Sequence, residues 1–151
     1  MKIIVLTDAS NRGKTTSIKL LATYFTRQEG FSTKVHISMP SNDENVVIET
    51  SNGSNIALCS GGDDRLTVEG NINFALSHNC DILVSAARSK GDGYNKITDF
   101  ILQKGNSGLL VKAIDFWAEN NCLADNENKN LAISSLTAEH LKHIVEYALT
   151  R

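Results

Sequence analysis

The chain has 151 residues, of which 41% are apolar, 21% are charged and one is proline. These are the proportions of an ordinary globular protein, and they exclude a disordered or fibrous chain. The formal net charge of −2 gives no broad basic field, so composition does not favour binding to nucleic acid or to an anionic membrane. The length fits a single domain over residues 1–151.

The sequence begins with one lysine and a short apolar run before Asp8. This run is too short for a signal-peptide core or a membrane span, and it predicts a strand. The three cysteines lie far apart without a C-x-x-C pair, which favours reduced thiols and a cytoplasmic protein. His36 and His78 are isolated, and His140 and His143 share a predicted helix at i, i+3. Without nearby Cys or carboxylate ligands, this pattern favours a solvated helix face over a metal site.

A phosphate-binding loop is predicted directly after this strand. The order Asp8-x-x-x-x-Gly13-Lys14-Thr15 matches the pattern G-x-x-x-x-G-K-[ST] except at its first position. A helix predicted over residues 13–28 would begin at the same point, with its positive dipole end facing the loop. Gly13 allows the backbone to approach an anion closely. The alternative is an ordinary helix N-terminus in which Thr15 and Thr16 are capping neighbours.

On these residues the chain resembles the P-loop NTPase superfamily and, less specifically, short P-loop proteins of bacterial or phage origin. The resemblance covers roughly the first fifth of the chain. It implies that Lys14 reaches the β- and γ-phosphates and that the Thr15 hydroxyl binds Mg²⁺. It also implies that ATP or GTP is the nucleotide and that the phosphates contact a run of loop residues, namely Ser10, Asn11, Arg12, Gly13, Lys14, Thr15 and Thr16.

Asp8 departs from the family pattern, which has glycine there. A carboxylate at this position would repel phosphates unless it points away or faces the metal or a basic group such as Arg12.

A second strand is predicted over residues 31–38, followed by a polar loop over residues 39–45. Because this loop follows a strand, it could lie near a nucleotide. Alternatively, the loop is a solvated connection between two strands. Asn52-Gly53 between two strand-like runs, 46–50 and 55–59, predicts a β-hairpin.

The hairpin ends at Ser60-Gly61-Gly62-Asp63-Asp64. In P-loop proteins the strand beside the loop strand often ends in an acidic residue that holds the magnesium shell. The resemblance thus makes Asp63 a candidate to hold Mg²⁺ with Thr15 or to position water. In the competing interpretation Asp63 or Asp64 caps the next helix, predicted over residues 65–78. Cys59 stands where the family pattern expects an acid.

A buried strand over residues 81–86 leads into a basic loop that contains Arg88 and Lys90. In an open α/β sheet ligands lie at the carboxyl ends of the strands, so both side chains are candidate phosphate clamps. Arg88 is also a candidate catalytic residue, because an arginine can stabilise charge in the transition state. A solvated basic loop is equally compatible with the sequence.

The remaining pattern predicts a helix over residues 94–104, a strand over 109–114 and a closing helix that begins near Thr137. Between the last two, Phe116 or Trp117 could stack on a base, although core packing is the usual role of large aromatic residues. No guanine-binding N-K-x-D signature follows a strand, so the sequence does not identify the base of the nucleotide.

Together these elements predict an α/β fold with helices on both faces of a mostly parallel sheet of about five strands, plus an antiparallel edge from the hairpin. Three functions follow. The first is Mg²⁺-dependent nucleoside triphosphate binding with slow hydrolysis by Lys14, Asp63 and Arg88. The second is a small kinase with Arg88 and Lys90 on the acceptor side. The third is a degenerate P-loop domain that acts through a protein partner.

Overall fold

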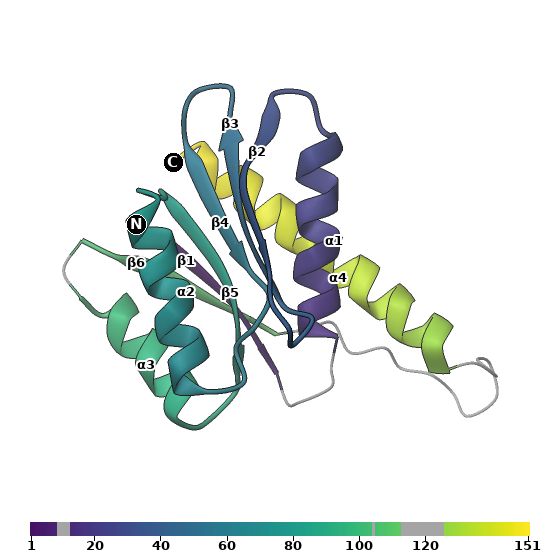
Figure 1. Cartoon of the computed structure of the whole chain (residues 1–151), viewed down its shortest axis with the longest axis vertical. Helices are drawn as coiled ribbons and strands as arrows, with labels where there is room; N and C mark the ends of the chain where they lie inside the picture. The colour runs from purple at the N-terminus through teal and green to yellow at the C-terminus, as the bar shows by residue number, and fades with distance from the viewer. Residues whose placement is uncertain (9–12, 104, 113–125) are drawn as a thin grey trace.

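The computed structural model describes residues 1–8, 13–103, 105–112 and 126–151 (Figure 1). Within these ranges the chain forms six strands and four helices. In chain order they are β1 (Lys2–Asp8), α1 (Lys14–Arg27), β2 (Phe31–Ser38), β3 (Glu44–Thr50), β4 (Asn55–Cys59), α2 (Arg65–Ser77), β5 (Ile82–Arg88), α3 (Asp92–Ile101), β6 (Ser107–Lys112) and α4 (Asn126–Leu149).

The strands form one mixed sheet in the order β2-β3-β4-β5-β1-β6. The pairs β4–β5, β5–β1 and β1–β6 are parallel, whereas β2–β3 and β3–β4 are antiparallel. The prediction of an α/β fold is therefore confirmed. Because β3 alone reverses direction, β2 runs the same way as β4, and the chain leaves both strands at the same edge of the sheet.

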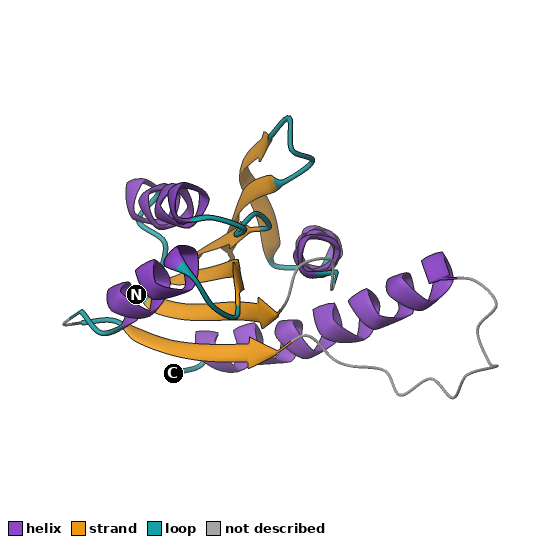
Figure 2. Cartoon of the chain, turned by 90° about the horizontal axis from the view of Figure 1, so that it is seen from below, coloured by secondary structure: helices purple, strands orange, loops and turns teal. Residues whose placement is uncertain are grey.

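Helices cover both faces of this sheet (Figure 2). Alternate residues of β1 point to opposite faces, so Ile4 and Leu6 pack against α1 and α4, while Ile3 and Val5 pack against α2 and α3. All four side chains are buried, which explains why β1 reads as a continuous apolar run rather than as an alternating one.

The hairpin prediction is also confirmed. β3 and β4 are antiparallel and are joined through Asn52-Gly53, where Gly53 has φ +85°. However, β4 does not lie beside β1 as the family pattern suggested, because β5 pairs with both of them. β5 is buried at six of its seven positions, and this central place in the sheet accounts for its apolar sequence.

The closing helix is longer than predicted. α4 begins at Asn126, eleven residues before Thr137. The sequence around the start of α4 is polar and rich in asparagine. It does not predict a helix, because asparagine is a weak helix former and the segment has no sustained apolar period. Within the described ranges no helix combines the length and the apolar character that a membrane span requires.

Two cysteines lie in the core and are not joined in a disulfide. Burial raises the pKa of the Cys59 thiol strongly and that of Cys80 to about 11. Both thiols are thus protonated at neutral pH, which agrees with a packing role. Cys122, Phe116 and Trp117 lie outside the described residues.

Candidate phosphate-binding site

The residues singled out in the sequence gather at the carboxyl edge of the sheet. β1, β2, β4 and β5 all end there, and α1, α2 and α3 begin there, at the lower end of the molecule in Figure 1. This is the edge at which open α/β sheets bind ligands. Of the predicted loop contacts, Ser10, Asn11 and Arg12 lie outside the described residues.

Gly13 is held in a conformation that requires glycine. Its φ is +74°, and an added Cβ would lie 2.5 Å from the Ser134 hydroxyl of α4. The Gly13 carbonyl accepts hydrogen bonds from the Ser17 backbone N–H and hydroxyl, each 2.8 Å away, and from the Ser134 hydroxyl at 3.5 Å. α4 therefore braces the start of α1.

Lys14, the first residue of α1, is 7% exposed. Its ammonium group donates a hydrogen bond to the Asp8 carbonyl oxygen at 3.1 Å, so the amine turns back over the end of β1. Burial lowers the pKa of Lys14, while the negative charges of Asp63 and Asp8 act in the opposite direction. A desolvated cation of this kind gains more from an anionic ligand than a solvated one does.

The next side chain, Thr15, contacts a carboxylate that the sequence did not single out. Its hydroxyl lies 3.3 Å from Asp43 Oδ1 and 3.2 Å from the Ser60 carbonyl oxygen. Three oxygen atoms from α1, from the loop before β3 and from the end of β4 thus meet at one point. Oxygen ligands of this type, including a single carboxylate, suit Mg²⁺.

Asp43 is placed by the loop over residues 39–43, which folds back on itself. The Met39 N–H donates to the Asp43 carbonyl, and Ser41 donates to the Asp43 carboxylate at 2.9 Å. Lys19 of α1 ties the loop down, because its ammonium group donates to the Asn42 carbonyl at 2.9 Å and pairs with Glu44 at 3.1 Å. These contacts fix the loop against the start of α1.

The two glycines after β4 are closely packed, Gly61 against the Thr67 and Asp43 side chains and Gly62 against the backbone of β5. A Cβ on Gly62 would lie 1.9 Å from the Ala86 carbonyl oxygen, which no rotamer change could relieve. Buried Asn71 of α2 fixes the same turn, because its amide donates to the Gly61 carbonyl at 2.8 Å and to the Ser85 hydroxyl at 3.0 Å. This anchoring holds the Ser60 carbonyl against Thr15.

Asp63 and Asp64 play different parts. Asp64 is the N-cap of α2, as one interpretation predicted, and accepts hydrogen bonds from the N–H and the hydroxyl of Thr67, both at 2.9 Å. These bonds lower the pKa of Asp64. Asp63 is exposed and pairs with Arg88 Nε at 3.3 Å. Arg88 in turn is the Cα partner of Asp8 in the register of β5 on β1.

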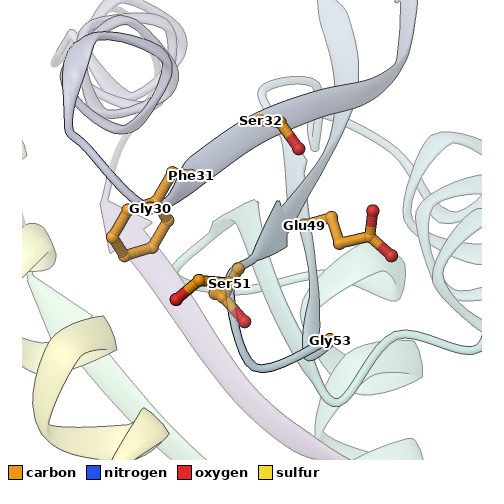
Figure 3. A pocket seen from close by; sticks show the side chains of 7 residues that line it. Gly30, Phe31, Ser32, Glu49, Ser51 and Gly53 are labelled. Atoms are coloured by element: carbon orange, nitrogen blue, oxygen red, sulfur yellow. The ribbon is translucent and has the colours of Figure 1, made fainter.

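Thr16 and Lys90 are both exposed. Lys90 lines a hollow of about 420 Å³ together with Arg88 and Asp63. A different hollow, of about 460 Å³, lies at the tip of the β3–β4 hairpin (Figure 3). Its described lining includes Ser32, Glu49 and Ser51 but no lysine or arginine, so it does not suit a phosphate.

Gly13, Lys14 and Thr15 are consecutive at the start of α1, and Asp43 lies against Thr15. The sequence signal for Asp43 is its place in the polar loop that follows the second strand. Among the described residues no group of three or more His, Cys, Asp or Glu side chains could hold a metal ion. Comparison with family models, curated proteins and solved structures finds no significant match.

Proposed function

We propose that the chain binds a nucleoside triphosphate with Mg²⁺ at the loop between β1 and α1 and hydrolyses it slowly. The observation that carries this proposal is the contact of the Thr15 hydroxyl with the Asp43 carboxylate, next to the buried ammonium group of Lys14. A strand, a loop and a helix N-terminus in this order provide the backbone donors that phosphates require.

The residues present fit a magnesium ion held partly by the phosphates. Mg²⁺ commonly keeps several waters and takes only one or two protein carboxylates, so a cluster of three acidic side chains is not needed. Thr15 and Asp43 would hold the ion, which would neutralise charge on the β- and γ-phosphates. Asp43 replaces Asp63 in this assignment, because Asp43 is the carboxylate that Thr15 contacts.

The other charged groups would act around the terminal phosphate. Lys14 would stabilise negative charge between the β- and γ-phosphates, and Arg88 would supply a second positive charge from the end of β5. Asp63, held by Arg88, would orient the attacking water. A nucleotide-dependent role agrees with the cytoplasmic location that we propose. The proposal is supported by an α/β sheet in which β1 runs parallel to both of its neighbours and α1 begins at the carboxyl edge of β1.

A second candidate is a small kinase, favoured by the hollow beside Arg88 and Lys90. In this function the γ-phosphoryl group would pass to a small acceptor instead of water. Nucleotide consumption would then depend on the acceptor, whereas hydrolysis would not.

The test is a calorimetric titration of the protein with ATP and with GTP, each with and without Mg²⁺, and with Lys14→Ala in parallel. The proposal predicts Mg²⁺-dependent binding of at least one nucleotide by the wild type and its loss in the variant. If neither nucleotide binds a folded wild-type protein, both enzymatic functions are rejected, and a degenerate P-loop domain that acts through a protein partner becomes the better explanation.

A further inference from the structure

A hollow of about 420 Å³ opens beside the proposed nucleotide site, between the start of α2, the end of β5 and the start of α3. Its size is within the range of small-molecule sites. It lies at the same edge of the sheet as the loop before α1, since β1 and β5 are neighbours and end in register at Asp8 and Arg88. Its charged lining residues are Asp63, Asp64, Arg65, Arg88, Lys90 and Asp92.

The cations of this hollow keep donors for a ligand. In the described part of the chain, Arg65 and Lys90 are exposed and form no ion pair within 4 Å, and the charge of Arg65 helps to lower the pKa of Glu69 on α2. Arg88 meets Asp63 through Nε. A guanidinium carries five N–H donors, so Arg88 keeps donors for a second anion.

The acids of the hollow are mostly engaged. Both carboxylate oxygens of Asp64 accept hydrogen bonds from Thr67, and Asp63 pairs with Arg88. Asp92 lies in the first turn of α3, where a carboxylate is stabilised by the helix dipole. The three carboxylates balance the three cations in charge, but the hydrogen-bond donors that remain for a ligand belong to Arg65, Arg88 and Lys90. Two arginines favour a group that accepts bidentate hydrogen bonds.

The geometry points to a second ligand site in this hollow, for a small phosphate monoester. Arg65, Arg88 and Lys90 would hold the phosphate group, and exposed Leu66 would lie against the apolar part of the molecule. The presence of a nucleotide beside this ligand rests on the proposed function. The binding of the monoester does not depend on it.

The experiment measures binding of phenyl phosphate by calorimetry, in the absence of nucleotide and Mg²⁺. Wild type is compared with Arg65→Gln, with Lys90→Gln, with Lys14→Ala, and with Lys34→Gln. The last change removes one positive charge, paired with Glu49, from β2, which β3 and β4 separate from β5. Circular dichroism checks that each variant is folded. We expect binding by wild type and by Lys34→Gln, and about tenfold weaker binding when Arg65 or Lys90 is replaced. Lys14→Ala shows whether phenyl phosphate binds in the loop before α1 instead.

Three results would overturn the inference. The first is no binding of phenyl phosphate by the wild type, and the second is equal or tighter binding of benzoate. The third is loss of binding in Lys14→Ala with no change in Arg65→Gln, which would place the anion in the loop before α1. A parallel titration with ATP and Mg²⁺ separates the two proposals, because failure of ATP to bind while phenyl phosphate binds rejects the proposed function alone.

Discussion

Replacement of Gly62 by alanine should destabilise the protein because this glycine presses on the backbone of β5. The added Cβ would lie 1.9 Å from the Ala86 carbonyl oxygen, 2.4 Å from its carbon and 2.9 Å from the Ala87 nitrogen. To reach ordinary contact at 3.4 Å from the oxygen, the two segments must separate by about 1.5 Å. Overpacking costs about 1–3 kcal/mol, and the upper part of this range applies because the contacted atoms are backbone.

Thermal unfolding followed by circular dichroism measures this cost. In a domain of this size, 1 kcal/mol changes Tm by about 2–4 °C, so a loss of about 3 kcal/mol lowers Tm by about 6–12 °C. Gly70→Ala is the matched control, because Gly70 lies within α2 and a Cβ there would meet nothing within 4 Å. That change should stabilise the protein by about 0.5–1 kcal/mol. A Gly62→Ala protein that melts at the wild-type temperature would refute the packing of this turn against β5.

Two further changes test the charges of the site. Because burial lowers the pKa of Lys14, its charged form is disfavoured in the folded protein, and Lys14→Met should raise the free energy of unfolding of the nucleotide-free protein at pH 7 by about 0.5–2 kcal/mol. This gain in stability should shrink as pH rises toward 10.5, because the Lys14 amine is then neutral in the folded protein and loses its proton in the unfolded chain as well. Urea unfolding at pH 7 and at pH 10 measures the gain. A gain that grows with pH would contradict the lowered pKa of Lys14. Asp64→Ala should cost about 1 kcal/mol through loss of the α2 cap, seen as a lower Tm. Asp64→Ser, which can cap as well, should recover most of it, and equal loss in both variants would argue against a capping role.

Much of the fold could be predicted from the sequence because most elements carry a local signal. The strand and hairpin limits at residues 31–38 and 55–59 agree with the structure, since β-branched residues and Asn52-Gly53 mark them directly. The place of β5 between β1 and β4 could not be predicted, because strand order depends on contacts far apart in the sequence. The start of α4 was missed because its first turns are polar.

Some residues of the candidate site could likewise be predicted from the sequence, and others could not. Gly13, Lys14 and Thr15 are adjacent in sequence and form a spacing motif, so their grouping was predictable. Asp43 has no motif of its own, and it reaches Thr15 only because β2 ends at the same edge of the sheet as β1. The choice between Asp43 and Asp63 therefore required three-dimensional geometry.

The most direct test of the proposed site is the effect of Mg²⁺ on nucleotide affinity in Asp43→Asn, compared with Asp63→Asn and with wild type. Asparagine keeps the size of aspartate and removes its charge, so the loop over residues 39–43 should stay folded. If Asp43 and Thr15 hold the magnesium ion, Mg²⁺ should tighten binding in wild type and in Asp63→Asn, and Asp43→Asn should lose about tenfold or more of that gain. A full Mg²⁺ effect in Asp43→Asn, together with its loss in Asp63→Asn, would contradict this account and assign the metal to Asp63.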